Sequence, residues 1–291
     1  MNVAINGRDF TGDLLTVIQD MFAFLEAENC AIQIEQDFRD NCQANNVQLP
    51  KHTIFSNLHE LIDADLAISI GGDGTLLETV SYVGKKEIPI LGINMGRLGY
   101  LATTKREDIR ESLSEFINGN YELDKRTLLS LITEDKRFGN KNFALNEVAI
   151  LKRDTSSMIR AHISVDDVFL NSYWADGIIV STPTGSTGYS LSCGGPIVLP
   201  GSENLIITPI CPHNLTMRPL IIPDKSKIQI DLEGRTKNIL ISLDSRSESV
   251  PTNFSLKVQK AGFKANLVKL KNSVYFNTLR EKLNWGKDVR N

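Results

Sequence analysis

Several features that mark other protein classes are missing from this sequence. It has four cysteines in 291 residues and no C-x-x-C pair, and this sparse spacing excludes a disulfide framework. No apolar run approaches the length of a membrane span, and the first residues lack a basic segment followed by an apolar one. We therefore expect a protein of the reducing cytoplasm with no membrane partner.

Concentrated positive charge and metal-binding patterns are also missing. The formal net charge is -3 and no run of Lys or Arg occurs, which argues against a nucleic-acid partner because phosphate-backbone binding needs a basic footprint. The four histidines show neither metal-ligand spacing nor a partnered Cys or Ser motif. We predict no metal-ligating residue, and we expect any anionic ligand to be held locally.

The first part of the chain alternates between strand and helix patterns. Apolar strands are predicted at Val3 to Ile5, Leu66 to Ile70 and Ile88 to Asn94. Helical spacing follows from Leu14 to Leu25, with candidate caps at Thr11 and Asp13, from Thr75 to Val83, and from Arg106 to Asn118, with Gly119 as the cap. This alternation predicts an α/β domain over residues 1–120, built on a parallel sheet.

From about Tyr121 the pattern changes to short strands separated by turn residues, which predicts an all-β domain over residues 121–271. Asp166-Asp167 and Glu233-Gly234 are candidate hairpin turns. The end of the chain, about residues 272–291, returns to a helical pattern, and we expect this helix to pack back on the first domain.

The stretch GGDGT, Gly71 to Thr75, lies between a predicted strand and a predicted helix. Asp-Gly between apolar runs is also a signal for a tight hairpin turn. In the strand-loop-helix context, glycines let main-chain N–H groups surround an anion at a helix N-terminus, and Thr75 is the candidate cap. Neither G-x-x-x-x-G-K-[ST] nor G-x-G-x-x-G is present. Because a carboxylate beside phosphates must hold a metal or take a proton, Asp73 is the candidate general base.

A second glycine-rich stretch, ADGIIVSTPTGSTGYSLSCGGP, covers Ala175 to Pro196. One interpretation is an ordinary polar loop or linker, although its prolines and Tyr189 make it too rigid for a linker. The other is a bed of hydroxyls and exposed amides for ribose, phosphate and base edges, with Tyr189 offering an aromatic face and Asp176 an acceptor. Asn146-Glu147 interrupts an apolar strand, and it is either a satisfied structural network or a ligand site.

These residues resemble the NAD kinase family. The resemblance is carried by GGDGT at Gly71 to Thr75, GINMGRLGYL at Gly92 to Leu101, LNE at Leu145 to Glu147, DGIIVSTPTGSTGYSLSCGGP at Asp176 to Pro196, PHNLTMRPL at Pro212 to Leu220 and YFNTLREKLNW near the C-terminus. GGDGT alone is shared with diacylglycerol-type lipid kinases and phosphofructokinases. The long Thr/Gly/Ser motif in an all-β domain makes the combination specific.

The resemblance implies a Rossmann-like N-terminal domain, a β-rich NAD-binding C-terminal domain, and a homo-oligomer, dimer or tetramer. It implies that ATP, with Mg²⁺ or another divalent metal, phosphorylates the adenosine ribose 2′-hydroxyl of NAD to give NADP. By motif position the implied proton acceptor is Asp73. The implied ligand-binding residues are Gly71, Gly72, Asp73, Gly74, Thr75, Asn146, Glu147, Asp176, Thr187, Gly188, Tyr189, Ser190, Leu191 and Ser192.

The sequence departs from the family pattern at three positions. Trp174 stands where related sequences often have Arg, and Ser157 where they often have His. In ISLDSRSESV, Asp244 lies in a motif similar to the family's, but Arg246 stands where Gln or His is common. Arg246 is a candidate ligand-binding residue, and the alternative is an exposed charged residue of a β-turn.

Two other functions fit parts of the sequence. A lipid kinase of the diacylglycerol type shares the Gly-Asp-Gly loop, but it needs a hydrophobic groove, whereas the second motif is dense in hydroxyls. A non-enzymatic module that senses NAD(P) is the alternative from another class. The range of phosphoryl donors, the choice between NAD and NADH, and feedback by NADPH stay open at this stage.

Overall fold

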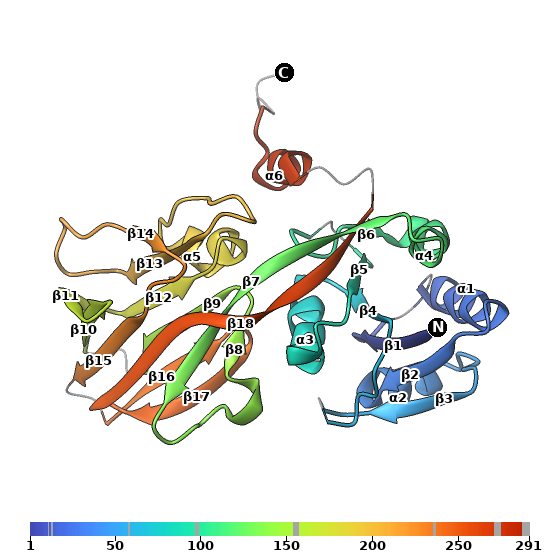
Figure 1. The fold of residues 1–291 in the computed structure, drawn as a ribbon, viewed down its shortest axis with the longest axis horizontal. Helices are drawn as coiled ribbons and strands as arrows, with labels where there is room; N and C mark the ends of the chain where they lie inside the picture. The colour runs from blue at the N-terminus through green and yellow to red at the C-terminus, as the bar shows by residue number, and fades with distance from the viewer. Residues whose placement is uncertain are drawn as a thin grey trace. The chain divides into compact units, whose positions relative to one another are not determined.

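The computed structural model describes residues 1–10, 12, 14–57, 59–96, 99–153, 157–234, 237–270 and 275–286. The chain forms two compact units, Met1–Lys125 with Ala265–Asn291, and Arg126–Lys264. Both crossings between the units lie inside long strands, β7 (Tyr121–Thr133) and β18 (Phe254–Leu270), which are green and orange-red in Figure 1. The division therefore falls a few residues away from the boundaries at 120 and 271 that the sequence pattern predicts.

The first unit contains a parallel sheet in the spatial order β5-β4-β1-β2-β3. Its strands are β1 (Asn2–Gly7), β2 (Ala31–Glu35), β3 (His52–Phe55), β4 (Leu66–Gly71) and β5 (Ile90–Asn94); β6 (Thr104–Lys105) and the end of β18 also pair with β5. Every residue of β5 is buried, as expected for strands that are covered on both faces. The predicted strands at β1, β4 and β5 are confirmed, whereas β2 and β3 had no counterpart in the sequence prediction.

The helices of the first unit are α1 (Leu14–Ala27), α2 (Gln36–Ala44), α3 (Asp73–Val83), α4 (Ile109–Ile117) and α6 (Tyr275–Leu283), with short 3₁₀ turns η1 (Gly84–Lys86) and η2 (Arg106–Asp108). Helix α1 buries the face formed by Ile18, Met21, Phe22 and Leu25, in agreement with its apolar spacing. Gly119 follows α4 with φ of 74°, the conformation of a glycine cap. The candidate caps Thr11 and Asp13 lie outside the described residues.

The second unit is a β-sandwich. One sheet has the order β14-β13-β12-β9-β16-β17, and the other contains β11-β10-β15-β18 together with β7 and β8. The remaining elements of this unit are β8 (Phe143–Ala144), β9 (Glu147–Lys152), β10 (Ile159–Val165), β11 (Val168–Ala175), β12 (Gly177–Ser181), β13 (Asn204–Ile210), β14 (Leu220–Pro223), β15 (Ile228–Gly234), β16 (Asn238–Leu243), β17 (Arg246–Pro251), η3 (Gly139–Lys141), η4 (Thr184–Thr187) and α5 (Tyr189–Ser192).

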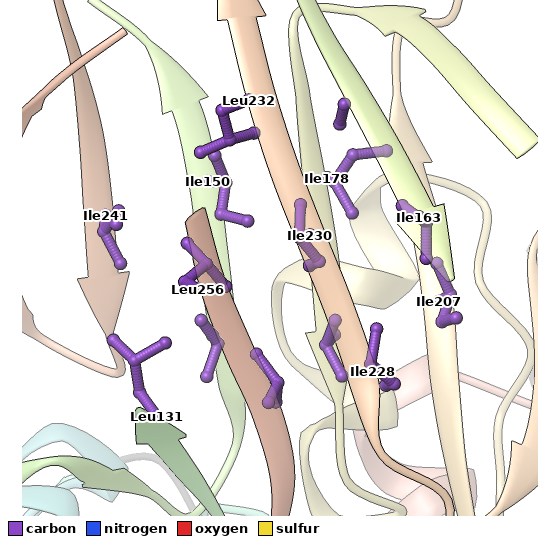
Figure 2. Packing of buried hydrophobic residues seen from close by; sticks show 14 of the residues in the cluster. Leu131, Ile150, Ile163, Ile178, Ile207, Ile228, Ile230, Leu232, Ile241 and Leu256 are labelled. Carbon is purple, nitrogen blue, oxygen red and sulfur yellow. The ribbon is translucent and has the colours of Figure 1, made fainter. Parts of the chain in front are cut away.

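Apolar side chains from both sheets of the second unit form one core. Ile230 on β15 and Leu256 on β18 belong to the same buried cluster as Ile150 on β9 and Ile178 on β12, and Figure 2 shows these side chains in the space between the strands. The alternating burial along β10 and the first half of β15 places every second residue in this core. The core fixes the strands whose ends carry the polar motifs.

The predicted hairpin at Asp166-Asp167 is confirmed. These two residues have φ of 50° and 64°, they connect β10 with β11, and positive φ at both central positions is typical of a tight hairpin turn. The predicted hairpin at Glu233-Gly234 is wrong, because β15 pairs with β10 and β18 while β16 pairs with β9 and β17. The chain changes sheets there.

The predicted fold class, an α/β unit with a parallel sheet followed by an all-β unit, is confirmed. Among the helices in the described part of the chain, none combines the length and apolarity that crossing a membrane requires.

Candidate functional site

The stretch GGDGT connects β4 to α3. Strand β4 ends at Gly71, Gly72 is the N-cap of α3, and the helix begins at Asp73. The hairpin interpretation is therefore wrong, and so is the expectation that Thr75 caps the helix. Thr75 is 2% exposed and lies in the first turn, because the chain turns sharply at Gly71 and enters the helix two residues earlier.

The glycines of this loop have different physical roles. Gly71 has φ of 155°, and a Cβ there would lie 2.3 Å from Thr75 Oγ1, so the fold itself requires glycine. A Cβ at Gly72 or Gly74 would meet nothing within 4 Å. The N-cap residue, Gly72, provides no side-chain hydrogen bond to the N-terminus of α3. Bare backbone with open space at a helix N-terminus suits the approach of an anion such as a phosphate.

The Asp73 carboxylate is held by the segment Gly99–Ala102. Its Oδ2 accepts the N–H of Tyr100 at 2.8 Å, and its Oδ1 accepts the N–H groups of Leu101 and Ala102, both at 3.0 Å. Asp73 and the motif GINMGRLGYL both stand out in the sequence, but their contact was not predicted, since a hydrogen bond from the main chain leaves no trace in side-chain identity. The glycine at position 99 was the available signal.

In the second unit, Asn146 lies at a break in the strand rather than inside it. Strand β8 ends at Ala144 and β9 begins at Glu147. The Asp244 carboxylate accepts the N–H groups of Leu145, Asn146 and Glu147 at 2.8, 2.9 and 3.2 Å. This three-amide contact lies at the break between β8 and β9, and Asn146 Nδ2 lies 3.7 Å from the position of a Cβ at Gly188.

The Asn146–Glu147 turn packs against the second glycine-rich stretch. Thr182 donates its N–H to Asn146 O at 2.9 Å and its hydroxyl to Leu145 O at 2.6 Å. A Cβ at Gly185 would lie 2.1 Å from Asn146 O, and one at Gly188 would lie 3.1 Å from Glu147 Oε2. The glycines therefore permit close approach, and the fold brings together two motifs that are about 40 residues apart.

Glu147 has an unusual electrostatic environment. Burial, followed by the negative charge of Asp244, raises the pKa of Glu147 to about 8, against a hydrogen bond from the Tyr189 N–H that lowers it. Burial also raises the pKa of Asp244, although its three amide donors and Arg246 act in the opposite direction. Two neighbouring carboxyl groups in a desolvated site repel each other when both are ionised, so the state with both charged is disfavoured. A protonated Glu147 can donate a hydrogen bond as well as accept one.

Much of the bed of hydroxyls predicted for the second stretch is buried and turned to structural contacts. Ser181, Thr182, Thr184, Ser186 and Ser190 are 0–6% exposed. Ser190 Oγ pairs with Thr208 Oγ1 at 2.8 Å, and Ser186 Oγ donates to Pro183 O at 2.7 Å. The hydroxyls of Thr182, Thr184, Ser186 and Ser190 are hydrogen-bonded within or against the turns of η4 and α5, as buried polar groups usually are. Among the described residues, Ser181 Oγ is buried without a partner.

Other residues of this stretch stay accessible. Tyr189 is 39% exposed, Ser192 is exposed, and Thr187, Gly188 and Leu191 are half-buried. Burial raises the pKa of Tyr189, with further contributions from nearby ionisable groups that include Asp176 and Glu147. Asp176 forms an ion pair with Lys152, with Oδ1 and Nζ 2.6 Å apart. The second unit thus gathers Asp176, Glu147, Gly188 and Tyr189 in one neighbourhood.

Two arginines bind the main chain and a hydroxyl next to these residues. The terminal nitrogens of Arg246 donate to the carbonyl oxygens of Lys141 and Phe143, so its guanidinium binds main chain rather than standing exposed in a turn. Arg126, 6% exposed, donates to Thr184 Oγ1 at 3.1 Å. The burial of Arg126 was not predicted, because nothing in its sequence context distinguishes a buried arginine from a solvated one.

Two of the family departures, Trp174 and Ser157, line one cavity of about 910 Å³ in the second unit. Trp174 is 50% exposed, and the Arg160 guanidinium lies over its ring, 4.5 Å from the centroid. This stacked pair is a cation–π contact.

Comparisons with known proteins agree with this geometry. The family model of the ATP-NAD kinase N-terminal domain matches residues 14–121, and that of the C-terminal domain matches residues 145–270. The chain is 53% identical to the NAD kinase of Cytophaga hutchinsonii and 44% identical to that of Flavobacterium johnsoniae, with all of each chain covered.

Solved structures are similar over the same length. An NAD kinase from Archaeoglobus fulgidus in complex with ATP has a TM-score of 0.75 and 28% identity, and the match covers 98% of this chain and 99% of that one. Yeast NADH kinase complexed with NADH has a TM-score of 0.88 at 24% identity, covering 100% of this chain and 89% of that one, and it supports the fold alone. The protein with the Asp73 loop and the Asn146–Glu147 turn belongs to the ATP-NAD kinase family.

Proposed function

We propose that the protein transfers the γ-phosphoryl group of ATP to the adenosine ribose 2′-hydroxyl of NAD, forming NADP and ADP, with Asp73 as the proton acceptor. The observation that carries this proposal is a carboxylate in the first turn of a helix whose N-cap is a glycine, beside two glycines whose backbone has open space around it. Phosphoryl transfer needs such bare backbone for the phosphates and a group placed for the attacking hydroxyl. Membership of the family supports the same reaction.

For the dinucleotide we propose polar groups of the second unit, some exposed and some partly buried. Asn146, Glu147 and Asp176 offer amide and carboxyl groups suited to sugar hydroxyls, and Tyr189 offers a half-exposed ring for a base. Thr187, Gly188, Leu191 and Ser192 complete this surface. Ser190, whose hydroxyl already pairs with Thr208, contributes through the turn that it stabilises.

We propose that Mg²⁺, or another divalent cation, acts with the phosphates of ATP. Mg²⁺ commonly keeps several waters and binds through substrate phosphates and one or two carboxylates, where it neutralises charge on the transferring group. The described residues hold no group of three or more His, Cys, Asp or Glu side chains arranged for a metal. We therefore assign no dedicated protein ligand.

We place the enzyme in the cytoplasm, and we propose that it forms a homo-oligomer, a dimer or tetramer. The absence of a spanning helix from the described residues and the sparse cysteines fit this placement. The family resemblance supports the oligomer, and size-exclusion chromatography with light scattering tests it.

The deciding experiment incubates the purified protein with ATP, Mg²⁺ and NAD and looks for NADP with a dehydrogenase specific for NADP. Formation of NADP at a rate proportional to enzyme supports the proposal. Phosphorylation of diacylglycerol without NADP favours the lipid kinase, and NAD binding without turnover favours a sensing module. Repeating the assay with other nucleoside triphosphates, polyphosphate and NADH defines the donor and acceptor range.

A further inference from the structure

The strongest unassigned feature is the segment Gly99–Ala102, which donates three consecutive main-chain N–H groups to one carboxylate. Nothing in the GGDGT loop itself bonds the Asp73 side chain in this way; the donors come from residues 27 to 29 positions later in the chain. Carboxylates bound by several amides are fixed in orientation. The segment therefore sets where the two oxygens of Asp73 lie.

The three bonds do not fill the carboxylate. An ionised carboxylate has about four acceptor positions, two on each oxygen. Oδ1 accepts from Leu101 and Ala102, whereas Oδ2 accepts from Tyr100 alone. Counting the donors in the described part of the chain, one acceptor position remains, and it lies on Oδ2.

The segment is itself closely packed against its neighbours. A Cβ at Gly99 would lie 2.0 Å from Asp73 Oδ1 and 2.7 Å from its Cγ, so only glycine permits this approach. On the other side, a Cβ at Gly92 of β5 would lie 3.0 Å from the Cα of Ala102. The Lys282 ammonium of α6 lies over the Tyr100 ring, 5.8 Å from its centroid.

We propose that Gly99–Ala102 is a positioning segment for phosphoryl transfer, which holds the Asp73 carboxylate so that Oδ2 takes the proton of the attacking hydroxyl. This inference rests on the proposed function. The 2′-oxygen of the ribose forms its bond to the γ-phosphorus while the bond to the β,γ-bridging oxygen breaks. The hydroxyl proton passes to Oδ2, ADP leaves, and the proton is released to solvent.

The test compares Gly99→Ala with Gly96→Ala. Both substitutions add one methyl group to the same loop, but a Cβ at Gly96 meets nothing within 4 Å. We expect Gly99→Ala to lower kcat by about 100-fold, because misplacing a catalytic group by about 1 Å has an effect of that size, with the KM values for NAD and ATP within about twofold. Gly96→Ala should keep the wild-type kcat.

A kinetic cycle shows whether Gly99 acts through Asp73. In an Asp73→Asn background, Gly99→Ala should cost less than about threefold further in kcat, because residues acting as one unit are not additive. A full 100-fold loss in that background would overturn the proposal. So would a kcat for Gly99→Ala equal to that of Gly96→Ala, and in that case NADP formation by the wild type would leave the proposed function intact.

A second measurement does not depend on the folding of any variant. A crystal structure of the wild-type protein with NAD should place Oδ2, and not Oδ1, within about 3.2 Å of the ribose 2′-hydroxyl, the reach of a general base. Contact through Oδ1, or a 2′-hydroxyl beyond reach of both oxygens, would overturn the assignment. If the wild-type protein makes no NADP at all, the proposed function fails and this inference fails with it.

Discussion

The two units use the same backbone device around two aspartates, but in different surroundings. Asp73 accepts three consecutive amides from residues 100–102, and Asp244 accepts three from residues 145–147. Asp244 sits in a tight turn with φ of 53°, and burial dominates its pKa. Asp73 instead borders the open space at Gly72 and Gly74. Both carboxylates keep one acceptor position on Oδ2 by this count; the enclosed contact, at Asp244, shapes a loop, whereas in the open one, at Asp73, that position borders accessible backbone.

The largest effect should come from removing each carboxylate in turn. Asp73→Asn should lower kcat by roughly 10²- to 10⁴-fold, the usual contribution of a general base, with little change in NAD affinity. Asp244→Asn should mainly weaken NAD binding and lower Tm. The substitution replaces one carboxylate oxygen by an NH2 group, which cannot accept the main-chain N–H groups that hold the Asn146 turn. Steady-state kinetics and thermal melts of both variants measure this contrast. Near-native turnover in Asp73→Asn would remove the base assignment and make the two aspartates equivalent.

Two glycines beside Asp73 should have different roles, Gly71 in the stability of the fold and Gly72 in the binding of ATP. Gly71→Ala should lower stability by about 1–3 kcal/mol, the cost of holding a residue in a sparsely populated backbone conformation, in addition to its clash with Thr75. Gly72→Ala should leave Tm within about 2 °C, since little changes in the free protein, while it raises the KM for ATP severalfold by occupying the space for phosphate. Melting curves and ATP titrations decide the point. An unchanged KM for ATP in Gly72→Ala would argue against a phosphate at this loop.

For each of these contacts, the side chain was easier to predict from the sequence than its main-chain partner. Side chains with unusual chemistry in regular patterns, such as Asp73 after a buried strand, stand out because periodicity and glycine content frame them. Their partners are main-chain N–H groups of Tyr100 and Leu145, which carry no side-chain signal. The Glu233-Gly234 prediction was wrong for a related reason: turn chemistry is local, whereas the sheet that β16 joins is decided by the distant strands β9 and β17.

Buried polar groups were the other limit of prediction from sequence. A run of Ser, Thr and Gly reads as accessible, yet Ser186 and Ser190 are fully buried because β12 and β13 carry the stretch into the sandwich. Arg246 was likewise expected either at a ligand or in solvent, and it bonds the carbonyl groups of Lys141 and Phe143. Tertiary packing decided all three, and no local pattern records it.

Arg246 offers a smaller test of the enclosed contact. Arg246→Met keeps most of the side-chain volume but removes both bonds to carbonyl oxygens and the positive charge beside Asp244. We expect a loss of about 1–3 kcal/mol for the unsatisfied groups, or roughly 2–4 °C in Tm for each kcal/mol. Because the effect acts through the Asn146 turn, kcat should stay within about threefold while the KM for NAD rises. A lower kcat at unchanged Tm would instead indicate that Arg246 contacts substrate.

A pH dependence of stability should follow Glu147. Its pKa rises from 4.5 to about 8 on folding, so between these values the folded protein binds a proton that the unfolded chain has lost. Stability from this group is therefore complete below about pH 4.5 and is lost as the pH rises through 8. Glu147→Gln carries no such proton, and its Tm relative to wild type should increase steadily from pH 5 to pH 8 and then level off. Thermal melts of the two proteins in matched buffers without nucleotide measure the difference. A constant offset across the range would mean that Glu147 stays ionised beside Asp244, and the enclosed site would then resemble the open one in charge as well as in backbone geometry.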